Sequence, residues 1–275
     1  MNADLHCHST ASDGLLEPDE LAERARNRGI DLLSLTDHDG VSALAAMREA
    51  TESRGIRFVD GVEISACWRK TGIHVLGLGI DPRNPALVAG LQGIRDSRAG
   101  RARAMGQSLA DAGIDGALEG AMSYAGNPSL LSRTHFARFL VEAGHASDVR
   151  NVFQKYLVEG KPGYVEHEWA SLEDAVRWIR DSGGQAVVAH PARYPLSGDA
   201  MREFLCTFKE LGGTGIEVIS GAHTPDQNGD FAVLARELGF LGSRGSDFHG
   251  PGESKTDLGK VMPLPAGVEP VWNAW

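Results

Sequence analysis

The sequence has few cysteines and no long apolar run. Its 275 residues include three scattered cysteines, Cys7, Cys67 and Cys206, which are too few for a disulfide framework. No stretch of 18 consecutive apolar residues occurs, which argues against a transmembrane helix. The N-terminus also lacks the basic and apolar regions of a secretion signal. We therefore expect a cytoplasmic protein that does not bind a membrane.

Motifs for several common chemistries are missing as well. The sequence contains neither GxGxxG nor a Walker A loop, and no GxSxG turn of the serine hydrolases. The net charge is −10, from 27 basic and 37 acidic residues. Duplex DNA binding depends on Lys and Arg that neutralise phosphates, so this balance argues against a duplex DNA partner. The charge is uneven, however: residues 82–162 hold 10 basic and 7 acidic residues, and the remainder holds 17 and 30.

Short β-like runs alternate with helical patterns at both ends of the chain. Strands are expected at 3–8, 30–36, 56–64, 73–78, 184–190, 215–220 and 241–247, and helices at 21–28, 41–54, 172–182, 201–211 and 231–238. Helices between strands predict a parallel α/β sheet or barrel. Residues 87–156 have helical spacing and no convincing strand. We therefore expect a barrel domain at 1–81 and 163–275, interrupted by a helical insert at 82–162 that covers the active site.

Six of the ten histidines lie at predicted strand ends, and acidic residues accompany them. The histidines are His6, His8, His38, His74, His190 and His249, and the acids are Asp13, Asp37, Glu63 and Asp247. The C-terminal ends of parallel strands carry the active site in α/β folds. A single histidine on a strand is usually structural, but six at one edge of a sheet indicate a transition-metal site.

Residue spacing within these motifs supports a metal site. His6 and His8 stand at i and i+2 of a strand, so their imidazoles project from the same face. Asp247 and His249 repeat this spacing. Glu63 lies in an apolar strand, where an unpaired carboxylate is costly unless it binds a cation. These residue types together suit Zn²⁺, Mn²⁺ or Fe²⁺.

The candidate ligands fall in short motifs along the chain: His6-Cys7-His8-Ser9, Thr36-Asp37-His38-Asp39, Glu63 with His74, Ala189-His190-Pro191 and Ser246-Asp247-Phe248-His249. In this order they resemble the signature of the PHP (polymerase and histidinol phosphatase) family. The resemblance implies a distorted (β/α)₇ barrel of the PHP type with a helical insertion. It is strongest to stand-alone phosphoesterases, the branch of nucleotide 3′,5′-bisphosphate phosphatases and 5′-3′ exoribonucleases. We expect Asp39 to cap the helix that follows it.

The resemblance also implies three metal positions. The first is held by His6, His8, Glu63 and Asp247, the second by Glu63, His74 and His190, and the third by Asp13, His38 and His249. Some PHP proteins have His where this chain has Asp13, and an oxygen ligand there favours harder ions. We therefore expect two to three divalent ions, Mn²⁺ first, with Zn²⁺, Fe²⁺ or Mg²⁺ as alternatives.

Basic residues of the insert are candidates for binding the substrate. The candidates are Arg98, Arg101, Arg133, Thr134 and His135 of the insert, and Arg193 of the barrel. Arg98 and Arg101 share one helix face, and Arg133 stands at a helix start, where backbone N–H groups support phosphate binding. The alternative for these arginines is a solvated helix face. His223 follows a strand and is a candidate general acid, with a loop-stabilising role as the alternative.

The leading hypothesis is a metal-dependent phosphoric monoester hydrolase. It would remove the 3′-phosphate of a nucleoside 3′,5′-bisphosphate to give the 5′-monophosphate, by attack of hydroxide that the ions generate from water. One phosphate would bind the ions and the other the arginines. The alternatives are a 5′-3′ exoribonuclease on short single-stranded RNA, a histidinol-phosphate phosphatase, a hydrolase of C–N bonds and a non-catalytic metal-binding or polymerase-associated module.

Overall fold

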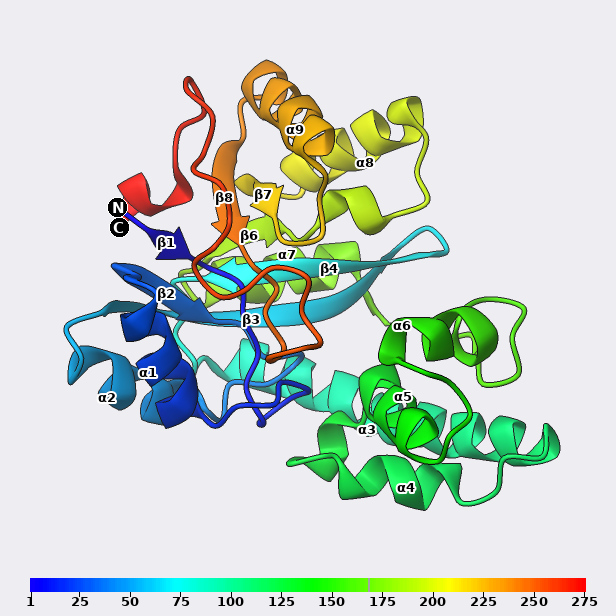
Figure 1. The fold of residues 1–275 in the computed structure, drawn as a ribbon. Helices are drawn as coiled ribbons and strands as arrows, with labels where there is room; N and C mark the ends of the chain where they lie inside the picture. The colour runs from blue at the N-terminus through cyan, green and yellow to red at the C-terminus, as the bar shows by residue number, and fades with distance from the viewer. Residues whose placement is uncertain (168) are drawn as a thin grey trace.

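A mixed sheet curls into a barrel whose outside is covered by helices (Figure 1). The computed structural model describes residues 1–167 and 169–275. The strands are β1 (Ala3–Asp4), β2 (Leu32–Leu35), β3 (Arg57–Trp68), β4 (Thr71–Leu78), β5 (Ala170–Ser171), β6 (Gln185–Val188), β7 (Gly215–Ser220) and β8 (Leu241–Gly245). The covering helices are α1 (Pro18–Asn27), α2 (Leu44–Glu52), α7 (Leu172–Asp181), α8 (Gly198–Glu210) and α9 (Pro225–Leu238).

The sheet runs in the order β1-β2-β3-β4-β6-β7-β8, and β5 pairs with β3. Its two edges meet, because Leu5 N donates to Arg244 O at 3.0 Å and Asp247 N donates to His6 O at 2.8 Å. Strands such as β6 are apolar on both faces, since one face packs inside the barrel and the other against helices. The predicted α/β barrel is confirmed.

The parallel pairing predicted from the alternation of helices and strands does not extend to β4. β3 and β4 form an antiparallel hairpin, and β4 is also antiparallel to β6. Only Arg69 and Lys70 separate the two strands, which is enough for a hairpin and far too short for a crossover helix. His74 therefore does not end its strand. It pairs with Ser65 near the start of β4, and the reversed strand direction brings it to the same edge.

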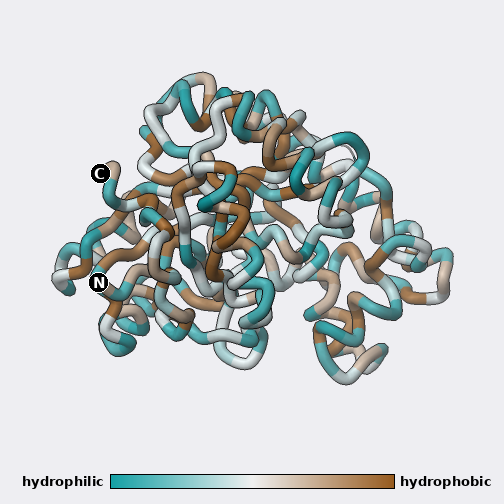
Figure 2. Tube along the Cα trace, turned by 90° about the horizontal axis from the view of Figure 1, so that it is seen from above, coloured by the Kyte–Doolittle hydropathy of each residue, from teal (hydrophilic) through white to brown (hydrophobic). Residues whose placement is uncertain are grey.

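The insert forms a helical lobe beside the barrel (Figure 1). Its elements are α3 (Pro85–Asp111), α4 (Ala117–Ser123), η1 (Pro128–Leu130), α5 (Arg133–Glu142), α6 (Val149–Val152) and η2 (Phe153–Leu157). The tube in Figure 2 has apolar segments inside both the larger body and this lobe. Leu91 and Ile94 of α3 pack in the barrel core, whereas Met105 and Leu109 pack in the core of the insert. The core thus changes within α3, and the domain limits at 82 and 162 stay a prediction.

Among the described residues, no helix combines the length and the apolar character that crossing a membrane requires.

Candidate metal centre

Strand ends bring imidazoles and carboxylates to one end of the barrel. His6 and His8 follow β1, His38 follows β2, His190 follows β6 and Asp247 follows β8. Two of these residues have positive φ angles, 27° at His190 and 55° at Asp247. Such a backbone costs about 1–3 kcal/mol per residue. The surrounding fold therefore holds these side chains in place at some expense to stability.

Glu63 of β3 lies at the centre of the histidines. Its Oε1 is 2.8 Å from His74 Nδ1 and 2.9 Å from His190 Nε2. Its Oε2 is 3.3 Å from Nε2 of both His6 and His8. This fully buried carboxylate contacts these four imidazoles and also that of His38, an arrangement suited to bridging two cations.

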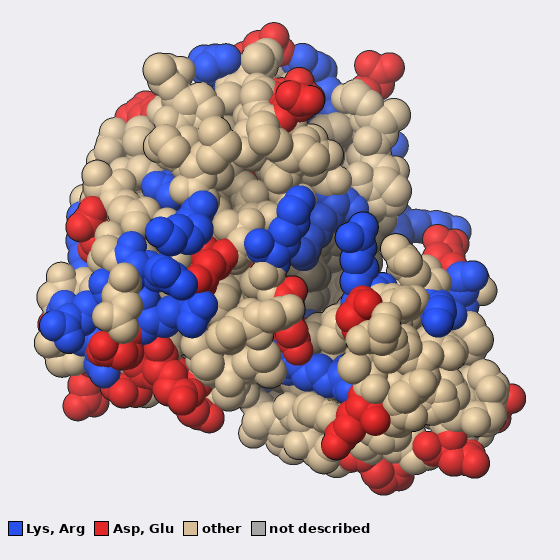
Figure 3. Space-filling model, in the orientation of Figure 1, with Lys and Arg blue, Asp and Glu red and all other residues tan. Residues whose placement is uncertain are grey.

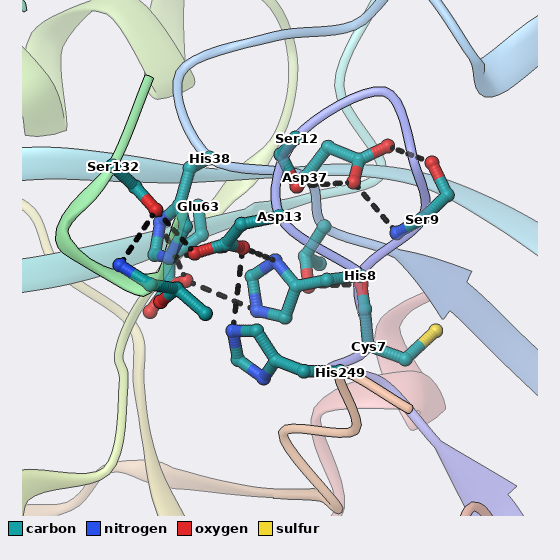
Figure 4. A network of polar contacts seen from close by, with 12 residues as sticks. Cys7, His8, Ser9, Ser12, Asp13, Asp37, His38, Glu63, Ser132 and His249 are labelled. Carbon is teal, nitrogen blue, oxygen red and sulfur yellow. Dashed lines mark hydrogen bonds and ion pairs between the residues drawn. The ribbon is translucent and has the colours of Figure 1, made fainter. Parts of the chain in front are cut away.

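Asp13 is the centre of a second set of contacts, drawn in Figure 4. Its Oδ1 is 3.3 Å from His249 Nε2, 3.8 Å from His38 Nε2 and 3.9 Å from His8 Nδ1. His38 also turns its Nδ1 toward Glu63 Oε2, at 3.0 Å. The loop that carries Asp13 therefore joins the cluster at its more exposed side, where His249 is 19 % exposed.

Potential ligand atoms fall into three groups, in each of which all atoms lie within 4.8 Å of one another. The groups are His6, His8, Glu63 and Asp247; His8, Asp13, His38 and His249; and His38, Glu63 and His74. The structure brings together all nine residues named as ligands from the sequence, but it shares His8 and His38 between groups. His190 joins the cluster through Glu63.

Unpartnered polar atoms show that this cluster suits cations. Within the described residues, buried atoms without a hydrogen-bond partner include His6 Nε2, His8 Nδ1, Asp13 Oδ1, His38 Nδ1, Glu63 Oε2 and His190 Nδ1. Buried polar atoms are normally satisfied. Divalent ions would satisfy nitrogen and carboxylate lone pairs that face one another, so the residues present fit such ions.

Electrostatics prepare several of these groups for metal binding. Burial, together with the nearby His249, lowers the pKa of His8 to about 3. Burial and Arg193 lower the pKa of His190 to about 3. Both imidazoles are therefore neutral at physiological pH, which is the form that ligates metals. Burial alone would raise the pKa of Glu63, but the surrounding imidazoles outweigh it and hold the carboxyl ionised.

A family model described as the PHP domain matches residues 4–186. The chain belongs to the PHP family. It is 51% identical over 272 residues to a 3′,5′-nucleoside bisphosphate phosphatase of Chromobacterium violaceum, covering 99% of this chain and 95% of the relative. It is 43% identical to the 5′-3′ exoribonuclease Rnm of Escherichia coli, covering 99% and 93%.

Solved structures share this PHP fold over the whole chain. A structure of a Chromobacterium violaceum amidohydrolase with bound sulfate and no metal superposes with a TM-score of 0.97 at 51% identity, covering 100% of this chain and 95% of that one. A Bifidobacterium adolescentis structure assigned as a metal-dependent phosphoesterase gives a TM-score of 0.83 at 25% identity, covering 99% and 93%.

Glu217 of β7 is a part of this PHP site that the sequence analysis missed. Its carboxylate is fully buried; Oε1 accepts from His6 Nδ1 at 2.9 Å, and Oε2 accepts from His190 N at 2.5 Å. This leaves Nε2 of His6 free to face Glu63. Gly245 makes room for the pair, because a Cβ there would lie 2.3 Å from His6 Cβ. An acid inside the apolar strand Gly215–Ser220 is the same signal that drew attention to Glu63.

Asp37 is not among the potential ligand groups but supports the loop that carries Asp13. It accepts from Ser9 N at 2.8 Å, from Ser9 Oγ at 2.7 Å and from Ser12 Oγ at 2.5 Å (Figure 4). Burial raises its pKa to about 6. Cys7 turns its sulfur away from the imidazoles in the same view. The Thr36-Asp37-His38 motif thus combines one ligand candidate with one carboxylate that positions another.

The interpretation of Asp39 as a helix cap is wrong, because α2 begins only at Leu44. Asp39 instead accepts from Ser65 N at 2.7 Å and from Arg98 Nε at 2.8 Å. Arg98 is 4 % exposed and also donates to Ser65 Oγ. Its guanidinium is occupied by barrel residues. Arg98 is therefore not available for the phosphate contact that the sequence suggested.

Two predicted histidines are buried in other roles. His135 is 1 % exposed, and its Nδ1 accepts from Ser132 N at 3.0 Å in the cap of α5. Thr134 likewise donates its backbone N–H to Ser132 Oγ. His223 stacks on Phe231, and burial lowers its pKa to about 4. A general acid must hold a proton at working pH, so this geometry does not support that role for His223.

Arg101 and Arg133 form a pair of uncompensated cations between insert and barrel. Arg101 stands over the Trp169 ring at 5.2 Å, and Arg133 over the Phe153 ring at 5.5 Å. Among the described residues neither pairs with a carboxylate. Burial and the charges of Arg133 and Arg98 lower the pKa of Arg101 to about 9. Figure 3 shows basic side chains around a hollow at this junction. Such a cluster is suited to an anion.

Arg193 lies at the edge of the ligand cluster. Its Nη2 is 2.9 Å from Asp247 Oδ2, and its side chain is 52 % exposed. It follows His190 by three residues in the short helix η3 (Pro191–Arg193). Unlike Arg98, it presents a guanidinium to solvent beside a candidate metal ligand.

Proposed function

We propose that this protein is a metal-dependent phosphatase that removes the 3′-phosphate of a nucleoside 3′,5′-bisphosphate and leaves the 5′-monophosphate. The observation that carries this proposal is the pair Arg101 and Arg133, which have no carboxylate partner among the described residues. Arg133 lies near enough to Arg193, at the edge of the ligand cluster, for their charges to interact. The arrangement offers one place for the reacting phosphate and another for a second phosphate. The name of the Chromobacterium violaceum relative supports this substrate class, and the sulfate in the related structure is an anion similar in shape to phosphate.

The proposed cofactor is two to three divalent ions, Mn²⁺ first. The proposed ligands are His6, His8, Asp13, His38, Glu63, His74, His190, Asp247 and His249. Bound divalent ions polarise phosphoryl oxygens and lower the pKa of a bound water to about 7. Asp13 gives its group an oxygen ligand where some PHP proteins have His, which shifts the preference of the group toward harder ions such as Mn²⁺. We propose a cytoplasmic location, because three scattered cysteines without a disulfide framework suit a reducing compartment.

The side chains of this chain supply orientation and charge. Arg193 presents a partly exposed guanidinium beside Asp247 at the edge of the cluster, and we propose that it donates to an oxygen of the reacting phosphate. Arg101 and Arg133 neutralise the second phosphate, and charge-assisted contacts of guanidinium to phosphate are strong and directional. Because the second phosphate does not react, these contacts select the substrate by binding energy away from the chemistry.

A 5′-3′ exoribonuclease is the second candidate, supported by the name of the Escherichia coli relative. The same two arginines would anchor the terminal 5′-phosphate of a short single-stranded RNA. This activity requires room for the chain beyond the first nucleotide, and the hollow in Figure 3 opens to solvent on the face shown.

The test compares Arg133→Ala with the parent on adenosine 3′,5′-bisphosphate and on p-nitrophenyl phosphate. Loss of one charge-assisted contact should lower kcat/KM for the bisphosphate about 10–100-fold, with little change for the monophosphate, which has no second phosphate. Arg103→Ala, on an exposed position of the same lobe, is the matched control. An equal loss on both substrates would contradict the proposal. A parent enzyme that prefers 5′-phosphorylated oligonucleotides to the bisphosphate would establish the second candidate.

A further inference from the structure

We propose that the insert holds the ligands of one metal position, the outer one, in place. Metal binding at the outer position then depends on the packing of the insert against the barrel, whereas metal binding at the inner position does not. The inner group is defined as His6, His8, Glu63 and Asp247, which are all buried. The outer group is His8, Asp13, His38 and His249, of which two are partly exposed. The inference rests on the proposed metal-dependent function and concerns which part of the chain holds each group.

Asp13 is tied to the insert by two hydrogen bonds. Ser132 Oγ donates to Asp13 Oδ2 at 3.0 Å (Figure 4), and Arg138 Nη2 donates to the Asp13 backbone oxygen at 2.7 Å. A third contact supports the same loop: a Cβ on Gly126 would lie only 2.4 Å from Thr10 O. The insert therefore packs directly on the loop that presents Asp13.

The same arginine reaches the segment that carries His249. Arg138 Nε is 2.8 Å from Glu253 Oε1, and Nη2 is 2.7 Å from Oε2, a bidentate pair. Next along the chain, Ser254 Oγ accepts from His249 N at 2.7 Å. Arg138 is 6 % exposed, so its guanidinium joins two barrel loops from inside the interface.

His38 is connected to the insert through its neighbour Asp39. Arg98 Nε donates to the Asp39 carboxylate at 2.8 Å, and Arg95 Nη1 donates to the Asp39 backbone oxygen at 2.7 Å. Both arginines belong to α3. Asp39 has a φ of 46°, a strained backbone that persists only where its surroundings fix it. Each of Asp13, His38 and His249 is thus held, directly or through a neighbour, by an insert arginine.

The inner group is held by barrel residues instead. Glu217 fixes His6 and the backbone of His190, and Asp4 Oδ1 accepts from Ser246 N at 2.8 Å, next to Asp247. Across residues 1–167 and 169–275, no side chain of the insert hydrogen-bonds to the side chains of His6, Glu63 or Asp247. A change in the insert should therefore disturb one metal position and spare the other.

The test is Mn²⁺ stoichiometry and affinity of the full chain, measured by elemental analysis and by competition with a chelator. Arg138→Gln should weaken one ion about 10–100-fold, as substitutions behind a ligand typically do, and leave the remaining ions bound as in the parent. Ser132→Ala, which removes a single hydroxyl, should do the same to a smaller extent. Arg138→Lys should recover part of the affinity, and Arg103→Ala should match the parent.

Three outcomes would overturn the inference: equal weakening of all ions in Arg138→Gln and in Ser132→Ala, unchanged binding of all ions in both, or a parent in which the outer position binds no Mn²⁺. These readouts separate it from the proposed function. A parent that binds ions as expected but hydrolyses no phosphomonoester contradicts the function alone. A fully active phosphatase whose ion binding ignores Arg138 contradicts the inference alone.

Discussion

The barrel and the insert contribute to the same site in different ways. Barrel side chains reach it because strands end there: His6 and His8 follow β1, and Asp247 follows β8. Insert side chains reach it by long arginines that cross an interface, such as Arg98 and Arg138. Backbone geometry therefore places the barrel's ligand residues, whereas side-chain contacts place those that the insert supports. A single substitution can remove a side-chain contact of this kind.

The largest effect on metal binding is expected for Glu63, which lies at the centre of the ligands that the barrel contributes. Glu63→Ala removes the carboxylate that contacts His6, His8, His74 and His190, and leaves these imidazoles facing one another. The paired ions should be lost and phosphatase activity should fall by more than the roughly 10–100-fold typical of changes behind a ligand.

Elemental analysis after incubation with Mn²⁺ measures this directly. Glu119→Ala, an exposed glutamate of the insert, is the control and should bind ions as the parent does. If Glu63→Ala retained two or more ions per chain, the bridging role given to this residue would be wrong.

The next largest effect concerns stability at the interface between the two regions. Arg98 and Asp39 form a buried ion pair, and removing one partner strands the other charge away from water. Arg98→Ala should therefore lower the free energy of unfolding by about 3–5 kcal/mol, measured by urea unfolding of the full chain.

A matched comparison sharpens this expectation. Arg95→Ala loses a hydrogen bond to the Asp39 backbone oxygen without stranding a carboxylate, so it should cost about 1 kcal/mol. The double variant with Asp39→Ala should be no less stable than Arg98→Ala. An Arg98→Ala cost equal to that of Arg95→Ala would mean that the ion pair does not anchor the insert.

A smaller effect is expected from the residue behind His6. Glu217→Gln keeps the size of the side chain but weakens the acceptor that fixes the His6 ring. The affinity of the inner ions should fall about 10–100-fold, with the outer ion less affected, the reverse of the pattern expected for Arg138→Gln. Chelator competition measures both. Identical patterns in the two variants would remove the distinction between the two regions.

The sequence predicts the barrel's part of the site better than the part contributed by the insert. The barrel and the ligand candidates could be predicted, because a strand's period of two and its polar end are local patterns. Glu217 carried the same signal as Glu63 and could have been found. The antiparallel β4 was also readable, since the eight residues between the expected strands at 56–64 and 73–78 are fewer than the dozen or so that a parallel crossover needs.

The contacts between the insert and the barrel correspond to no local pattern in the sequence. Arg98 and Asp39 are 59 residues apart, and Arg138 and Glu253 are 115 apart, so only the folded chain brings them together. The helix-face argument placed Arg98 and Arg101 on the same side, but it could not tell that Asp39 occupies one and leaves the other free. Burial separated His135 from Arg133 in the same way, although both stand in the first turn of one helix.

The smallest effect concerns the binding of nucleic acids, and it follows from how many basic side chains of the insert already pair with carboxylates of the barrel. The insert carries a net charge of +3, yet Arg98 and Arg138 pair with barrel carboxylates. Few cations remain to face a ligand, Arg101 and Arg133 first among them.

Since the slope of log K against log salt is about −0.7 per neutralised phosphate for single strands, a 5′-phosphorylated tetranucleotide that contacts these two arginines should bind with a slope of only about −1.4. Duplex DNA should not bind measurably at physiological salt, because the chain carries a net charge of −10 and duplex binding depends on cations that neutralise phosphates. Fluorescence anisotropy across a salt series tests both. A steep slope, or sub-micromolar duplex binding, would show that the insert faces nucleic acid with more charge than its docking contacts leave free.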